Sequence, residues 1–427
     1  MGNLLLERIR KKDKKKLFEA THTSVSYPTG FLPFDYKNGY VVSCMDDNEE
    51  LICQYNNLGI VGGTFVTIIG KSGVAKTTYA VQMSSAMVKP YDNAFVVHVD
   101  LEQTLTYTRI KAVNKFTQRE LKDKYVLKQE KCYIEDIFDM IVEICNTKED
   151  DKDAFTYESK FKDEFNNPVR LYVPTVIIID SIPTTASRDA KSEMEGSTYA
   201  NRKAKALSQF YQRAMPLLKQ YNITVIAINH INAKIEINAF AKTQPQLLYL
   251  KADESMPGGN APIYYANNIF KFIAEGKNKY NSEDDGFDGV KIRCELLKSR
   301  TNKAGQYCHL IYNQARGFSE IMTLFSFCID NGLVLGARKN SRYFKGHEDI
   351  KFDMTTWVRF EEEFMSRQDV RFAMHDVAMP LLEKDLSRCG DDNSQGMTLL
   401  EIIERIEASQ DNEDSLCSIS LEDKKSA

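Results

Sequence analysis

The stretch that decides the fold runs from residue 65 to residue 78 and reads Phe65-Val66-Thr67-Ile68-Ile69-Gly70-Lys71-Ser72-Gly73-Val74-Ala75-Lys76-Thr77-Thr78. An apolar run typical of a buried strand leads into a glycine-rich turn, and residues 79–88 continue with helical character. A strand, a glycine-rich turn and a helix form the setting in which G-x-x-x-x-G-K-[S/T] marks a phosphate-binding loop. Backbone N–H groups and the dipole of the helix both favour an anion at the helix start. The sequence therefore predicts that residues 70–78 contact the phosphates of a nucleotide.

Two side chains of this loop have predicted roles, and one residue departs from the pattern. Lys76 would reach the β- and γ-phosphates, and the Thr77 hydroxyl would hold Mg²⁺. Ala75 occupies the position where a second glycine is expected. Alanine is a mild replacement if the backbone there has a negative φ, and a costly one if φ is positive. The alternative interpretation is a turn of this composition without a nucleotide.

Composition limits the classes of protein to which the chain can belong. Of its 427 residues 43% are hydrophobic, which is enough for a large core, and its net charge of −4 argues against a uniformly basic nucleic-acid coat. Its nine cysteines include no C-x-x-C pair, so we expect reduced thiols in a cytoplasmic protein. No apolar run approaches the length of a membrane span, and we expect no membrane partner.

Acidic or polar residues end three further apolar runs. Residues 94–100 and 176–180 are predicted buried strands, and Asp100, Glu102 and Asp180 stand at their carboxyl ends, which is the ligand side of an open α/β sheet. Asp180 would complete the Mg²⁺ shell. Glu102 would orient a water molecule near the γ-phosphate, or is a surface carboxylate. The strand at 224–230 ends in His230, which is either a γ-phosphate sensor or an ordinary histidine at a strand end.

The remaining segments have weaker patterns. Residues 3–19 form a basic amphipathic helix candidate, for which a solvated helix, a docking arm and a DNA contact all stay open. Residues 146–170 are predicted to be a surface insertion, and 182–201 a Ser/Thr/Gly-rich mobile segment before a helix at 202–220. Residues 232–257 are a long loop, functional or disordered. A hairpin is predicted at 265–274 and 290–297, a strand at 307–312, a helix at 319–331, and basic loops and helices beyond residue 336.

Six stretches of the chain resemble, in order, the RecA family of strand-exchange recombinases, and in particular the UvsX type of tailed bacteriophages. They are residues 70–78, 100–102, 179–181, 227–230, 257–266 and 298–301. The segment at 257–266, with Gly258-Gly259-Asn260, is the most specific of them, and the resemblance extends over roughly residues 25–380. It implies an α/β fold: a RecA-like P-loop ATPase core with a mainly parallel central sheet flanked by helices. The implied parts are an N-terminal helical arm for subunit docking (1–35), the core with its DNA-binding loops (36–340), a small C-terminal helical region (341–409) and an acidic disordered tail (410–427).

The resemblance also assigns roles to individual residues. Glu102 would activate water, and Lys298 and Arg300 would reach the ATP of a neighbouring subunit. The loops at 184–203 and 231–260 would line the DNA path. The DNA-binding residues that we expect are Arg202, Lys203, Lys205, Lys234, Lys242, Gly258, Gly259 and Asn260. Three features depart from the family: Ala75, His230 in place of the glutamine usual in bacterial members, and the length and few cations of loop 231–257.

These observations lead to an expected function. The chain would be a DNA-dependent ATPase that uses ATP and Mg²⁺, forms a helical filament on single-stranded DNA, pairs it with a duplex and exchanges strands. A loading mediator and a single-strand-binding protein are expected partners, inside an infected bacterium. One alternative is a hexameric replicative helicase on the same core, although no collar domain fits before residue 60. The other is a non-catalytic DNA-binding or mediator paralogue, at which Ala75 would hint.

Overall fold

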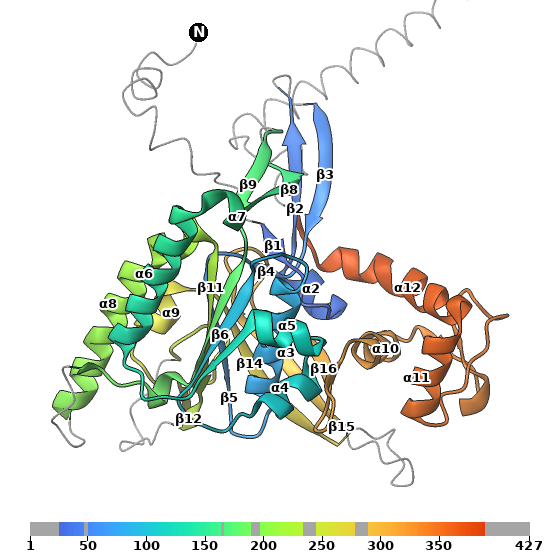
Figure 1. Ribbon diagram of the computed structural model, residues 1–427. Helices are drawn as coiled ribbons and strands as arrows, with labels where there is room; N and C mark the ends of the chain where they lie inside the picture. Colours follow the sequence, from blue (N-terminus) through green and yellow to red (C-terminus); the bar gives the residue numbers. More distant parts are fainter. Residues whose placement is uncertain are drawn as a thin grey trace, which may run out of the picture. The chain divides into compact units, whose positions relative to one another are not determined.

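The structure is a computed structural model of the 427-residue chain and describes residues 25–46, 50–163, 166–188, 197–233, 245–277 and 289–388 (Figure 1). The chain divides into two units, Met1–Ser387 and Arg388–Ala427. The architecture below is that of the first unit. The helix candidate at 3–19 and the acidic tail at 410–427 lie outside the described residues.

A nine-stranded sheet forms the centre of the first unit, in the order β17-β16-β15-β14-β5-β11-β10-β6-β7 (Figure 1). Its strands are β5 (Phe65–Gly70), β6 (Phe95–Asp100), β7 (Tyr125–Lys128), β10 (Thr175–Asp180), β11 (Ile223–His230), β14 (Ala266–Lys277), β15 (Gly289–Lys298), β16 (Tyr307–Asn313) and β17 (Gly317–Ser319). The strands from β14 to β7 pair in parallel, and β15, β16 and β17 continue one edge in antiparallel pairing. The expectation of a mixed α/β fold with a large, mainly parallel central sheet is therefore confirmed.

Helices cover both faces of the sheet, and the central strands are accordingly buried almost along their whole length. Every residue of β5 and of β10 is buried, as a parallel strand covered on both sides requires. One face packs against α3 (Lys76–Val88), α4 (Tyr107–Val113) and α5 (Gln118–Lys124). The other packs against α6 (Ile134–Asp150) and α8 (Ser197–Tyr221), which run side by side, and against α9 (Ala261–Tyr265) (Figure 1).

A separate apolar cluster joins the helices that follow the sheet to one that precedes it. It is built by α2 (Leu32–Asn38), α10 (Glu320–Asp330), α11 (Trp357–Ser366) and α12 (Gln368–Leu382). At its centre the ring of Phe325 in α10 stacks on that of Phe360 in α11, with centroids 3.6 Å apart. Helices on both sides of residue 340 therefore share one core.

Two hairpins lie where the sequence did not predict strands. Residues 40–57 form β2 (Tyr40–Met45) and β3 (Leu51–Asn57), which pair antiparallel. Residues 146–170, expected as a surface insertion, contain the end of α6, the short α7 (Lys152–Phe155), the strand β8 (Thr156–Lys162) and most of β9 (Pro168–Tyr172). The two hairpins touch, because Tyr55 stacks on Phe161 with ring centroids 4.6 Å apart.

The other elements are short. They are β1 (Ser26–Tyr27), β4 (Ile60–Val61), η1 (Ile182–Thr184), β12 (Asn232–Ala233), β13 (Glu254–Ser255), β18 (Val334–Leu335), η4 (Lys339–Ser341), β19 (Tyr343–Phe344), η5 (Glu383–Asp385) and β20 (Ser387–Arg388). The predicted long loop after β11 begins and ends in the paired strands β12 and β13. Among the described residues no helix is both long and apolar enough to cross a membrane.

Candidate functional site

The turn between β5 and α3 has a compact backbone with two residues in the left-handed region. Gly73 has φ +80°, and the Cβ that a larger residue would carry there meets nothing within 4 Å. Ala75 has φ 59° and ψ 26°, so the costly one of the two conformations considered for this position is the one present. Its side chain packs against the main apolar cluster. Gly70 has no room for a side chain, because a Cβ there would lie 2.7 Å from the backbone oxygen of Phe272.

Lys76 folds back over this turn. Its Nζ donates hydrogen bonds to the backbone oxygens of Gly70 at 3.0 Å and Lys71 at 2.8 Å, and the residue is only 6% exposed. Burial lowers the pKa of Lys76, while the carboxylates of Asp180 and Glu102 act in the opposite direction. The amine is held by neutral acceptors, which an anionic oxygen would replace favourably.

Thr77 and Asp180 meet as the sequence predicts. The Thr77 hydroxyl, in the first turn of α3, donates to Oδ2 of Asp180 at 2.6 Å, and Asp180 ends β10 at 2% exposure. In the described part of the chain no three His, Cys, Asp or Glu side chains gather as a metal cluster. One hydroxyl and one carboxylate nevertheless fit Mg²⁺, which is bound through one or two carboxylates, water and substrate phosphates.

Glu102 lies at the meeting point of three strand ends. Its Oε1 accepts a hydrogen bond from Ser181 Oγ at 2.7 Å and lies 3.4 Å from Nε2 of His230. Glu102 follows β6, Ser181 follows β10 and His230 ends β11, and these strands are neighbours. The side chains of Glu102 and His230 are each about one-third exposed, at 32% and 33%. Water therefore has access to this carboxylate.

The sequence assigned no role to two buried groups beside Asp180. Asp100 lies level with Asp180, and its Oδ2 accepts hydrogen bonds from Leu105 N–H at 3.0 Å and Gln129 Nε2 at 2.8 Å. His98 is fully buried two residues earlier in β6. The available signal was a histidine within the otherwise apolar run 94–99.

Lys298 and Arg300 lie away from the phosphate turn of their own chain. Both donate to carbonyl oxygens of α9: Lys298 Nζ to Ile263 at 2.6 Å and Tyr264 at 3.0 Å, and Arg300 to Tyr264 at 2.8 Å. Lys298 pairs with a β14 residue that is itself level with Thr67, three residues before the end of β5. The backbone of Lys298 therefore lies about 10 Å along the strands and about 10 Å across them from the end of β5, where the phosphate turn begins. Burial and the adjacent Arg300 lower the pKa of Lys298 to about 8.

The described residues expected to contact DNA converge on the start of α8. Gly259, with φ +72°, lies against the side chain of Ala204, where a Cβ would be 3.6 Å away. Ala204 stands between Lys203 and Lys205; Lys205 is exposed, while Lys203 donates to the backbone oxygen of Pro183 at 2.6 Å.

Five more residues were expected to contact DNA, and three of them lie in the described part of the chain. Arg202 is an exposed residue of α8, Gly258 has φ +98° and lies beside Ile182, and Asn260 precedes the first turn of α9. Lys234 and Lys242 lie outside the described residues.

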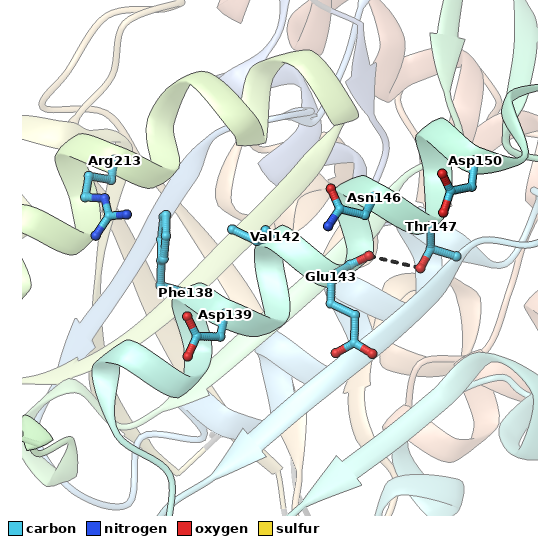
Figure 2. A pocket seen from close by; sticks show the side chains of 8 residues that line it. All are labelled: Phe138, Asp139, Val142, Glu143, Asn146, Thr147, Asp150 and Arg213. Carbon is cyan, nitrogen blue, oxygen red and sulfur yellow. Dashed lines mark hydrogen bonds between the residues drawn. The ribbon is translucent and has the colours of Figure 1, made fainter.

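A shallow groove of about 520 Å³ lies between α6 and α8, on the opposite face of the sheet from α3 (Figure 2). Its lining includes the carboxylates of Asp139, Glu143 and Asp150, and the guanidinium of Arg213 lies 4.4 Å from the ring centroid of Phe138. This acidic lining has the wrong sign for phosphate groups, so the groove is not a nucleotide site.

No protein-family model matches this chain. The contacts described above define the candidate site. It consists of the β5–α3 turn with Lys76 and Thr77, the carboxylates of Asp180 and Glu102, and His230, all at the carboxyl edge of the parallel strands.

Proposed function

We propose that the protein is an ATP-dependent DNA recombinase of the RecA type, similar to the UvsX recombinases of tailed bacteriophages. It would form a filament on single-stranded DNA and promote homologous pairing and strand exchange. The observation that carries the proposal is the convergence of a lysine, a hydroxyl–carboxylate pair and a hydrogen-bonded glutamate at one sheet edge. This edge is where ligands bind in open α/β sheets.

The nucleotide part follows from the side chains present. Lys76 would exchange its two carbonyl acceptors for phosphate oxygens, and Thr77 with Asp180 would hold Mg²⁺. The ion, when bound, neutralises charge that develops on the phosphates. Glu102 is held by Ser181 and is accessible to water. It would therefore accept a hydrogen bond from the attacking water and orient that water. His230 shares the same carboxylate oxygen and would connect this site to the loop after β11.

The DNA part rests on the start of α8 and the turn at Gly258 and Gly259. Cations beside a turn with positive φ provide both charge and exposed backbone N–H groups for a phosphate chain. Lys234 and Lys242 would add charge on the intervening loop.

Assembly would complete the active site. Because Lys298 and Arg300 lie away from their own phosphate turn, they would act on the nucleotide of an adjacent subunit, as cations that neutralise transition-state charge. Of the arm expected at 1–35, the part before residue 25 would dock on a neighbour, because Tyr27, Phe31 and Phe34 are buried in the core of their own chain. Single- and double-stranded DNA, a loading mediator and a single-strand-binding protein would be the partners.

The decisive experiment combines imaging with turnover. Electron microscopy with single-stranded DNA and a slowly hydrolysed ATP analogue should show helical filaments. Closed rings would instead indicate a hexameric helicase, and the absence of any assembly a non-catalytic paralogue.

Two variants test the roles in the nucleotide site. Glu102→Gln should keep nucleotide binding and lose about 10²–10⁴-fold in DNA-stimulated ATP turnover, whereas Lys76→Ala should lose turnover through weaker phosphate binding. Turnover of Glu102→Gln equal to that of the wild type would refute the role given to this carboxylate.

A further inference from the structure

We propose that His98 is a positioning residue that holds the Asp180 carboxylate in the orientation needed to bind the metal ion. This inference deepens the proposed function and rests on it. His98 touches neither nucleotide nor water, because it is fully buried in β6, under the carboxyl edge of the sheet.

The register of the sheet puts His98 and Asp180 on one face. His98 is level with Ile178 and Asp100 with Asp180, so the side chains of all four point to the side covered by α3. Nε2 of His98 lies 3.9 Å from Oδ2 of Asp180. That separation is too long for a hydrogen bond, and within the described chain Nε2 has no other hydrogen-bond partner.

Tyr125 and Asp180 together favour a proton on Nε2 of His98. The phenol oxygen of Tyr125 lies 2.8 Å from Nδ1 of His98, in a position where burial holds the pKa of Tyr125 well above its ordinary value. Tyr125 therefore keeps its proton and can donate it to Nδ1, and in that arrangement the ring proton is on Nε2. The carboxylate opposite favours the same tautomer, because an unprotonated Nε2 would place two acceptors face to face.

The site thus contains a buried N–H that points at the carboxylate of Asp180, and this carboxylate already accepts a hydrogen bond from another side chain. Among the described residues, Thr77 is the one side chain that donates a hydrogen bond to Asp180, and it uses the same Oδ2 atom. If the Thr77 hydroxyl held a metal ion, Oδ2 would lose this donor, and His98 Nε2–H would be placed to replace it. His98 would then keep the carboxylate of Asp180 turned toward the ion. Groups behind a ligand typically change metal affinity 10–100-fold.

Two amide substitutions separate the two ends of the imidazole. The amide nitrogen of His98→Gln can reach the position of Nε2, whereas the shorter amide of His98→Asn reaches only the position of Nδ1. Binding of a fluorescent ATP analogue is measured against Mg²⁺ concentration and again in EDTA, with the melting temperature of each variant recorded. We expect His98→Asn to raise the half-saturating Mg²⁺ concentration about 10-fold or more, with metal-free nucleotide affinity unchanged, and His98→Gln to restore most of the loss.

Tyr125→Phe provides an independent variant, because it removes the donor to Nδ1 while keeping the imidazole. A smaller rise in the Mg²⁺ requirement, in the same direction, is expected, and this variant carries the test if His98→Asn does not fold. An unchanged Mg²⁺ requirement in the folded variants would overturn the proposal, and so would equal losses in His98→Asn and His98→Gln. A wild-type protein that binds the nucleotide without any response to Mg²⁺, or not at all, would overturn the proposed function and this inference with it.

Discussion

Lys148 should make the stability of the protein depend on pH above neutrality. Its Nζ donates hydrogen bonds to the backbone oxygens of Val173 and Tyr221, both at 2.8 Å, and the residue is 1% exposed. It thereby ties α6 to the residues just after β9 and to the end of α8. Burial lowers the pKa of Lys148 to about 7, and the nearby Cys145 acts in the opposite direction.

The sign of the effect follows from proton counts. In the unfolded chain a lysine has a pKa of about 10.4, so between pH 7 and 10 the unfolded state binds more protons than the folded state. Stability therefore rises with pH across this window, and below pH 7 the full penalty for the buried charge is present. At about 1.4 kcal/mol per pKa unit, the gain from Lys148 between pH 7 and pH 9 is about 2 kcal/mol.

The perturbation is Lys148→Met, which matches the side chain in length and does not titrate. It leaves two carbonyl groups without a donor, a loss of about 1–3 kcal/mol each that does not vary with pH. The gap in unfolding free energy between wild type and variant should therefore widen by about 2 kcal/mol from pH 7 to pH 9. Urea denaturation at pH 7, 8 and 9 measures it, with the exposed Lys122→Met on α5 as the matched control. If the gap in unfolding free energy for Lys148→Met is as constant across pH as the gap for the control, the reasoning is refuted.

Three further outcomes test the turn, the hairpin and the assembly. Gly73→Ala should lower the free energy of unfolding by about 1 kcal/mol, because alanine is strained in the left-handed region. Ala75→Gly should change it by less than about 1 kcal/mol, because the strain that glycine relieves is offset by the greater conformational entropy that glycine gives the unfolded chain. Equal losses in both variants, by urea denaturation, would contradict these backbone conformations. Cys44 lies directly opposite Cys53 in β2 and β3, and opposite residues of such a pair have Cα atoms about 4.5–5.5 Å apart, a spacing that suits a disulfide. Treatment with diamide should therefore link the two cysteines, as detected by mass-spectrometric peptide mapping, and the absence of a link would argue against this register. Arg300→Ala should lower ATP turnover, and wild-type turnover per protomer should fall on dilution; a rate independent of concentration would place this cation in its own chain's site.

The core strands were predictable because their pattern is local. Strands buried on both faces are continuous apolar runs, and β5, β10 and β11 lie within a residue or two of the expected ranges. The carboxylates at their ends were predictable for the same reason, because parallel strands share one carboxyl edge. Thr77 and Asp180, 103 residues apart, meet on this basis alone.

The hairpins and the partners of Glu102 depend on contacts that no local pattern contains. Tyr55 and Phe161 stabilise each other across two hairpins, and neither hairpin has the strict alternation of a half-buried strand. Ser181 reaches Glu102 because β10 and β6 are neighbours, and His230 reaches it because β11 is the next strand. Strand order follows from the packing of the whole domain, so the sequence predicted each of these residues singly or not at all.

Three unfavourable features of the first unit lie at this edge. Ala75 has a left-handed backbone, and the buried Nε2 of His98 and Oδ1 of Asp100 have no hydrogen-bond partner among the described residues. Each of these costs free energy in the folded chain, of the order of 1–3 kcal/mol for a strained residue or an unsatisfied buried group. The proposed ligands would offset part of this cost. Phosphate oxygens would accept hydrogen bonds from the N–H groups of the turn, and a cation would lie beside the carboxylates of Asp100 and Asp180. Binding of nucleotide with Mg²⁺ should then stabilise the fold more than binding of nucleotide alone, and a thermal shift that does not depend on the ion would count against a metal site at Asp180.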